Sequence, residues 1–269
     1  MYKKLLNNAK RTNGSMLCVG LDPDPDLFVK SSEAVTVGQL AYMNTMIIEA
    51  TKDYAACYKL NLGFYLASSA PNWLITQTLR AIPDDVPVIL DGKFGDIENT
   101  AKHYAKFAFE SFGFDGVTLN PYMGADGFKP FYRPGKLNFI LTYTSNKPDI
   151  QTDVGLRAAS EAYSSSLVNN GNIGFVVGDP ERIADMRGRY PWLYFLVPGV
   201  GAQENDLEKI VRTGVRRVHG DGLLINVSRS LARVGQVEQW GMGGKYKEAV
   251  NAISNNAKGY VDAINSYRK

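Results

Sequence analysis

Short runs of apolar residues alternate along the chain with longer segments in which apolar residues recur at helical spacing. Short runs rich in β-branched and aromatic residues are typical of buried strands, and the longer amphipathic segments predict helices. The first predicted element is a strand near 15–22, and further strands are expected near 55–61, 87–91, 114–119, 138–143, 173–177, 193–197 and 223–227. Helices are expected near 38–53, 68–81, 97–112, 124–132, 153–170, 180–189, 204–213 and 244–266.

This alternation predicts the fold class. Apolar strands that alternate with helices are typical of a parallel sheet covered by helices. Eight such units in 269 residues fit an α/β fold, a single-domain (β/α)8 TIM barrel that spans residues 1–269. An open doubly wound sheet is the alternative. No linker or low-complexity tract divides the sequence, and no GxGxxG motif opens the first helix.

The composition excludes several classes of protein. Hydrophobic residues make up 45% and charged residues 21%, which is ordinary for a soluble globular chain. A net charge of +3 is too small to predict binding to nucleic acid. The sequence has no apolar run long enough for a membrane span and no apolar leader near its start, so we expect neither membrane association nor secretion.

The cysteine and histidine residues indicate the compartment. Cys18 and Cys57 each lie in an apolar run, which predicts buried free thiols in a reducing, cytoplasmic setting. Because His103 and His219 are far from each other and from the cysteines in sequence, a structural zinc site is not expected.

Charged and polar residues gather where the predicted strands end. In a barrel of this kind, the chemistry lies at the C-terminal ends of the strands. Helix caps would account for Asp, Asn and Ser there, but not for Lys or Arg. Three cations and two carboxylates on one rim indicate an anionic ligand. The residues at these ends are Asp22, Lys59, Asn61, Asp91, Lys93, Asn120, Thr144, Ser145, Gly178, Pro198, Ser228 and Arg229.

The densest segment is DGKFGDI, directly after the apolar run PVIL. Asp91 and Lys93 are two residues apart, so in a strand they point to the same face. Asp96 comes just before the next helix. Two carboxylates around one ammonium keep Lys93 charged and make it a candidate proton donor. The alternative interpretation is a salt-bridged turn that caps a helix.

Two further loops predict a phosphate site. PGVGAQ follows the seventh predicted strand and NVSRS follows the eighth. These are the usual phosphate-binding loops of such barrels. Gly199 and Gly201 let backbone amides approach a ligand closely, and Arg229 can pair with phosphate oxygens. Without Arg229, the glycines would indicate only a tight turn.

Taken in order, these segments resemble the orotidine 5′-monophosphate decarboxylase family, in its subgroup of longer bacterial-type sequences. The resemblance rests on CVGLDPDPD, YKLNLGFY, DGKFGDIENTAKHYA, VTLNPYMG, TYTSN, VPGVGAQ and NVSRS, and covers nearly the whole chain. It implies a (β/α)8 barrel, a homodimer with shared active sites, and decarboxylation of orotidylate to uridylate in pyrimidine biosynthesis. It implies neither a cofactor nor a metal.

The resemblance also implies roles for the matching residues. Lys93 would donate a proton to C6 of the pyrimidine, while Asp91 would face the substrate carboxylate. Lys59 would hold the Asp–Lys array and bind a ribose hydroxyl, and Asp22 would bind the ribose. The neighbouring subunit's site would be reached by Asp96, Ile97 and Thr100, and the pyrimidine edge would be contacted by Ser145. A closing loop would contain Pro198 and Gln203, and the phosphate would be bound at Ser228 and Arg229.

Two departures and two alternatives stay open. Ser228 stands where the family often has glycine, which leaves the backbone detail of the phosphate loop open, and the pattern KLNLGFY is not the family's commonest form, which leaves the role of Asn61 open. A metal-dependent sugar-phosphate decarboxylase of the same superfamily shares the Asp-x-Lys-x-x-Asp pattern, and a requirement for metal would favour it. A non-catalytic nucleotide-binding barrel is the second alternative, and it would bind ligand without turnover.

Overall fold

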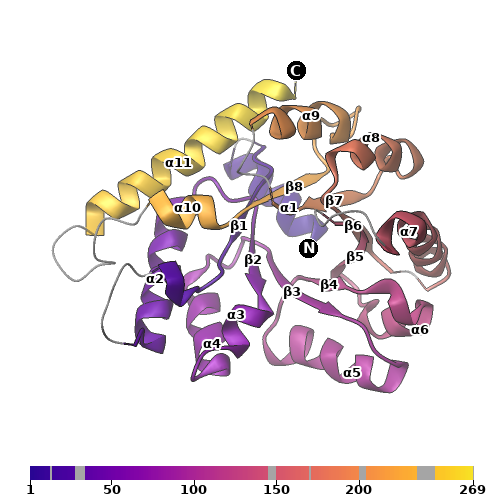
Figure 1. The fold of residues 1–269 in the computed structure, drawn as a ribbon, viewed down its shortest axis with the longest axis horizontal. Coiled ribbons are helices and arrows are strands. Elements are labelled where there is room, and N and C mark those ends of the chain that lie inside the picture. The colour runs from indigo at the N-terminus through magenta and orange to yellow at the C-terminus, as the bar shows by residue number, and fades with distance from the viewer. Residues whose placement is uncertain are drawn as a thin grey trace.

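Eight parallel strands close into a barrel in chain order, and β1 pairs with both β2 and β8 (Figure 1). The computed structural model describes residues 1–12, 14–27, 34–144, 150–169, 171–199, 204–234 and 246–268. The closed barrel confirms the predicted (β/α)8 fold, and the open-sheet alternative is wrong. The strands are β1 (Leu17–Gly20), β2 (Cys57–Asn61), β3 (Val88–Phe94), β4 (Gly116–Leu119), β5 (Leu137–Tyr143), β6 (Ile173–Val177), β7 (Tyr194–Val197) and β8 (Leu223–Val227).

Helices surround the barrel, and α11 runs along its outer edge (Figure 1). No helix within the described ranges is long and apolar enough to cross a membrane. The helices are α1 (Tyr2–Arg11), α2 (Val37–Thr51), α3 (Leu62–Leu66), α4 (Pro71–Ala81), α5 (Glu98–Lys106), α6 (Ala125–Phe128), α7 (Ile150–Val168), α8 (Pro180–Arg189), α9 (Glu204–Gly214), α10 (Arg229–Val234) and α11 (Tyr246–Tyr267). Three 3-10 turns are η1 (Pro25–Leu27), η3 (Pro121–Met123) and η4 (Lys129–Phe131), and η2 (Phe107–Ser111) is a π-helical segment that continues α5.

Several boundaries differ from the predicted ones. The helix expected at 68–81 begins only at Pro71, and a separate helix α3 precedes it. The single helix expected at 124–132 is wrong, because the short helix α6 and the 3-10 turn η4 occupy this stretch instead. The break has a local cause: Gly124 has a φ of 75°, and proline lies at position 130, where it cannot donate to a continuing helix.

Helix α1 closes the N-terminal end of the barrel, so the expectation that a strand is the first element is wrong. The Asn8 side-chain amide donates to the carbonyl oxygens of Ala55 and Ala56 at 2.8 and 2.9 Å, just before β2. Met1 and Leu5 are buried in the cluster that fills the barrel interior. In Figure 1 this helix lies behind the strands, so the view is onto their C-terminal ends.

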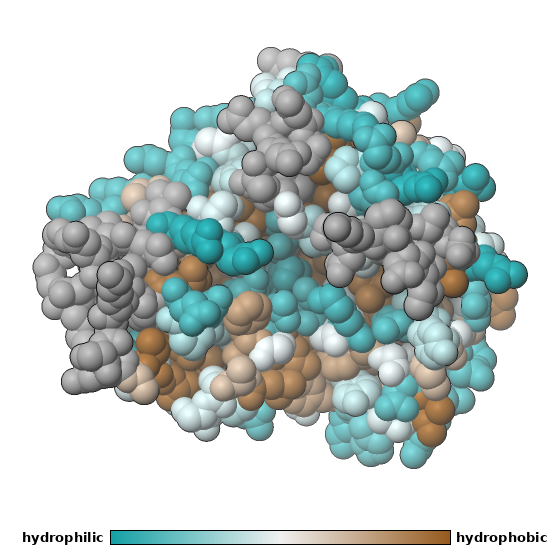
Figure 2. All heavy atoms as spheres, viewed as in Figure 1, coloured by the Kyte–Doolittle hydropathy of each residue, from teal (hydrophilic) through white to brown (hydrophobic). Residues whose placement is uncertain are grey.

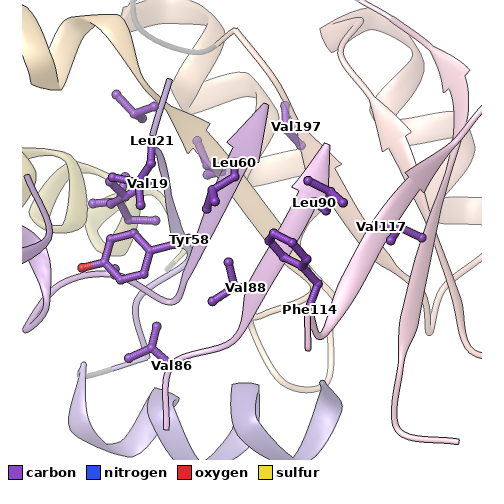
Figure 3. Packing of buried hydrophobic residues seen from close by; sticks show 14 of the residues in the cluster. Val19, Leu21, Tyr58, Leu60, Val86, Val88, Leu90, Phe114, Val117 and Val197 are labelled. Carbon is purple, nitrogen blue, oxygen red and sulfur yellow. The ribbon is translucent and has the colours of Figure 1, made fainter. Parts of the chain in front are cut away.

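The strands alternate between two buried layers, as a period of two requires. On β3, Val88 and Leu90 belong to the large cluster between the barrel and its helices, whereas Ile89 faces the interior (Figure 3). On β2, Tyr58 points outward, and its hydroxyl lies 3.0 Å from the hydroxyl of Thr51 in α2. The same alternation turns the next residue of β2, Lys59, toward the interior.

The barrel interior also contains both cysteines. Cys18 and Cys57 are register partners on β1 and β2, and both are buried free thiols, as predicted. They lie with other apolar residues of the interior cluster beneath the polar strand ends. Asn226 of β8, the register partner of Cys18, is also buried at this level, and its Oδ1 accepts from the Cys18 thiol at 3.6 Å.

Candidate active site

Charged side chains from β1, β2 and β3 meet at the C-terminal end of the barrel. The Lys59 ammonium lies 3.0 Å from Oδ2 of Asp91 and 4.0 Å from Oδ1 of Asp22. In the pairing of β2 with β3, Lys59 lies opposite Ile89 and Asn61 lies opposite Asp91. This register brings Lys59 and Asp91 to neighbouring positions that face the barrel interior. Figure 2 shows hydrophilic residues at the centre of this face. The structure thus assembles three of the residues that the sequence placed at strand ends.

Burial and charge together set the protonation of this cluster. Burial by itself would lower the pKa of Lys59, but the carboxylates of Asp22 and Asp91 outweigh it and raise this pKa to about 12. Burial would raise the pKa of Asp91, but the ammonium groups of Lys59 and Lys93 outweigh it and lower this pKa to about 2. Both groups are therefore charged at neutral pH, as a charge-stabilising site needs.

Lys93 completes the cluster through an unusual backbone. Its ammonium lies 2.7 Å from Oδ1 of Asp91, while half of its side chain is exposed to solvent. Lys93 has a φ of 47°, the only positive φ of a non-glycine residue among the described residues. The neighbouring Gly92 is required, because a Cβ there would lie 2.4 Å from the Phe94 ring. The predicted strand 87–91 is longer in the structure, where β3 runs to Phe94 and includes Lys93 but not Asp96.

Thr118 of β4 also binds this cluster, and the sequence interpretation missed it. Its hydroxyl donates to Oδ1 of Asp91 at 2.8 Å and accepts from the backbone N–H of Lys93 at 2.9 Å. The only signal in the sequence is a single polar residue inside the apolar strand GVTL. That pattern is equally typical of a threonine that packs in a sheet, because threonine is common in strands.

On the opposite side, Ser228 contacts Asp22. The Ser228 hydroxyl donates to Oδ2 of Asp22 at 2.6 Å, which links the end of β8 to the end of β1. The ends of β1 and β8 approach each other so closely that a Cβ on Gly20 would lie 2.6 Å from Cβ of Ser228. Oδ1 of Asp22 is buried and has no hydrogen-bond partner within the described residues. That oxygen is free to accept a hydrogen bond from a ligand hydroxyl.

Asp96 lies apart from the ammonium of its own chain. Its Oδ1 accepts from the backbone N–H of Ile97 at 2.7 Å, and no ion pair among the described side chains joins it to Lys93. Ile97 is 59% exposed, and Thr100 is half-buried on α5. The exposed residues Tyr122 and Met123 lie on η3, near the loop before α5. This part of the rim therefore presents apolar and acidic groups outward.

The phosphate-site residues are only partly described. Pro198 is half-buried directly after β7, and Arg229 is exposed at the start of α10, directly after β8. The pairing of β7 with β8 places these two ends side by side. Ser145 and Gln203 lie outside the described residues. Across the ranges that are described, His, Cys, Asp and Glu side chains form no group of three that could hold a metal ion.

Comparisons with known proteins agree on one family. The profile of the "Orotidine 5'-phosphate decarboxylase / HUMPS family" matches residues 15–240. An orotidine 5'-phosphate decarboxylase of Herpetosiphon aurantiacus is 40% identical over 243 residues, which cover 86% of this chain and 89% of that protein. One from Dehalococcoides mccartyi is 36% identical and covers 100% of this chain and 98% of that protein.

Solved structures agree in fold. The OMP decarboxylase of Leishmania donovani superposes with a TM-score of 0.76 at 35% identity, covering 99% of this chain and 98% of that one. The UMP synthase of the same organism gives a TM-score of 0.81 at 37% identity, and the match covers 100% of this chain but 56% of that longer one. The likeness therefore extends over the entire barrel.

Proposed function

Because this chain belongs to the orotidine 5′-phosphate decarboxylase / HUMPS family, we propose that it converts orotidine 5′-monophosphate to uridine 5′-monophosphate and CO₂ in pyrimidine biosynthesis. The observation that carries this proposal is the alternating array of Asp22, Lys59, Asp91 and Lys93 at the end of the barrel. A carboxylate between two ammonium groups is a fixed set of charges, which suits a reaction that develops and then quenches a carbanion.

The reaction follows from these charges. The bond between C6 of the pyrimidine and the carboxylate breaks, and its electron pair stays on C6. The Lys93 ammonium stabilises that negative charge and then donates its proton to C6. Because the Lys93 side chain is half exposed, the neutral amine can regain a proton from solvent. Asp91 would face the substrate carboxylate and favour its departure as neutral CO₂.

The remaining residues would hold the nucleotide. Asp22 and Lys59 are proposed to bind the ribose hydroxyls, and the free Oδ1 of Asp22 supports this. Arg229 is proposed to pair with the phosphate, far from the reacting carbon, so that its binding energy drives closure of the site. The other proposed substrate contacts are Ser145 at the pyrimidine edge, Pro198 and Gln203 in the closing loop, and Ser228 beside the ribose.

We propose a homodimer in which Asp96, Ile97 and Thr100 enter the partner's site. Two observations support it. Asp96 makes no ion pair with Lys93 of its own chain among the described residues. Ile97 and Tyr122 are large exposed apolar side chains, at 59% and 89%, in the segments that follow β3 and β4, where such an interface would lie. The cytoplasmic location stays a prediction from the free thiols.

The test is the loss of orotidylate absorbance when purified protein is added in the presence of a metal chelator. Turnover under these conditions supports the proposed function and contradicts the metal-dependent sugar-phosphate alternative. Binding of orotidylate without turnover would support the non-catalytic barrel instead. The Lys59 ammonium lies between the carboxylates of Asp22 and Asp91. We expect turnover without metal, because this ammonium supplies the positive charge that a metal ion would otherwise supply there.

A further inference from the structure

The pairing of β3 with β4 is interrupted at the charged segment. Leu90 pairs with Val117 and Phe94 pairs with Leu119, so residues 91–93 of β3 lie opposite Thr118 alone. Such a bulge leaves backbone groups without their ladder partners and redirects the side chains next to it. Something other than the regular ladder must therefore hold Asp91 and Lys93 in place.

The Thr118 side chain makes hydrogen bonds in place of the missing ladder bonds. Its hydroxyl accepts from the backbone N–H of Lys93 at 2.9 Å. The same hydroxyl donates its single proton to Oδ1 of Asp91 at 2.8 Å, the oxygen that also accepts from the Lys93 ammonium at 2.7 Å. One hydroxyl thus joins the backbone of one charged residue to the carboxylate of the other.

The geometry gives this hydroxyl an energetic role. Lys93 has a φ of 47°, a left-handed conformation that is unfavourable for a non-glycine residue and persists only when neighbouring groups hold it. Thr118 is 1% exposed, so bulk water cannot readily replace its hydroxyl. Without it, the N–H of Lys93 and one acceptor site of Asp91 would lose their partners.

We infer that Thr118 is a positioning residue for the proposed decarboxylation: its hydroxyl holds the carboxylate of Asp91 and the backbone of Lys93 in the one arrangement that aims the Lys93 ammonium at the reacting carbon. This inference rests on the proposed function. Thr118 acts through these two residues, and small displacements of a group that acts in the transition state lower kcat more than they raise KM.

The experiment compares Thr118→Val with Thr118→Ser on orotidylate. Valine keeps the shape and removes the hydroxyl, so we expect kcat to fall about 10- to 100-fold while KM changes less than about threefold. Serine keeps the hydroxyl, and its kcat should stay within about threefold of the original protein. Affinity for uridine 5′-monophosphate, measured by calorimetry, should be unchanged in both, because the ribose and phosphate contacts lie elsewhere.

A matched control is Thr142→Val. Thr142 is a buried threonine on β5, at the shift in register between Leu141 and Tyr143, and its hydroxyl donates to the carbonyl of Val176 at 2.8 Å rather than to a carboxylate. Its loss should leave kcat within about threefold. If Thr142→Val lowers kcat as much as Thr118→Val does, the effect belongs to any strand hydroxyl and the inference is overturned.

Two other results would also overturn it: a Thr118→Val protein with kcat near the original value, or equal losses in the valine and serine variants. If Thr118→Val does not fold, Thr118→Ala replaces it, because alanine also removes the hydroxyl and its smaller side chain cannot clash with its neighbours. Its kcat should then lie between those of the original protein and Lys93→Ala, and an unchanged kcat would refute the positioning role. If the original protein itself has no turnover, the proposed function fails instead.

Discussion

The ammonium of Lys93 lies 2.7 Å from Oδ1 of Asp91, although only Gly92 separates the two residues in the sequence. In a regular strand, the side chains of residues two apart point to the same face and extend parallel to each other. The bulge in β3 and the left-handed backbone of Lys93 bring the two charges into contact. The ion pair is therefore a product of local backbone strain that the neighbouring strand supports.

Lys93→Ala should abolish most of the turnover. We expect kcat to fall by about 10²- to 10⁴-fold, the range typical of a general acid, because the variant has no proton donor at C6. The matched control is Lys102→Ala, an exposed lysine on α5 whose ion pair with Glu98 is at the surface. Steady-state kinetics decide the matter: a Lys93→Ala enzyme within about tenfold of the original kcat would contradict the role as acid.

Arg229→Ala should weaken binding of orotidylate by about 2–4 kcal/mol, if the guanidinium and phosphate are desolvated together. It should scarcely change turnover of orotidine, the nucleoside without phosphate. Arg233→Ala, an exposed arginine of the same helix α10, serves as the control and should affect neither substrate. Equal losses of kcat/KM for orotidylate and orotidine in Arg229→Ala would show that Arg229 does not bind the phosphate.

The charged array predicts how stability depends on pH. The pKa of Asp91 is lowered to about 2, so its contribution is present above its unfolded pKa of about 4 and is lost as pH falls toward 2. The pKa of Lys59 is raised to about 12, so its contribution is present below its unfolded pKa of about 10.4 and is lost as pH rises through 12.

Lys59→Met tests this coupling. Asp91 would lose one of its two cations, so its pKa should rise toward the unfolded value of about 4, and the loss of unfolding free energy between about pH 4 and pH 2 should become smaller than in the original protein. Urea unfolding between about pH 2 and pH 7 measures the effect. The control is Lys3→Met, an exposed lysine of α1, which should keep the original profile. Superimposable acid profiles for Lys59→Met and the original protein would mean that the two charges are not coupled.

Shared active sites predict complementation between two inactive variants. In a mixed dimer of Lys93→Ala and Asp96→Ala chains, the barrel with intact Lys93 receives an intact Asp96 from its partner, and the other barrel lacks both. Random exchange makes half of the dimers mixed, so about one quarter of all sites should become active. If the mixture stays inactive after subunit exchange has been verified by mass spectrometry, then Asp96 serves its own barrel.

Helix α1 should contribute to stability through Asn8. This side chain is 1% exposed and donates to two carbonyl groups at the start of β2, so Asn8→Ala should leave both acceptors unpaired. We expect a loss of about 1–3 kcal/mol in the free energy of unfolding, measured with urea. Asn7→Ala, one residue away on the exposed face, should change it by less than about 0.5 kcal/mol. Equal effects would assign the loss to helix propensity.

The order and type of most elements, and the inward direction of Lys59 and Asp91, could be predicted from the sequence alone. The strands at 173–177 and 223–227 and the helix at 180–189 agree with the structure to the residue. Period-two alternation also turns Lys59 and Asp91 to the same side of their strands. These features depend on local spacing of apolar and polar residues, which any reader of the sequence can see.

The closure of the barrel end by α1 and the contacts within the charged cluster could not be predicted from the sequence. Helix α1 was missed because its apolar residues are buried only once the end of the barrel lies beneath them. Thr118 was missed because its partners, Asp91 and Lys93, lie more than twenty positions away in sequence and come within reach only through the β3–β4 pairing. Periodicity records which side of a strand a residue faces, but hydrogen bonds and ion pairs depend on distances that only the closed barrel defines.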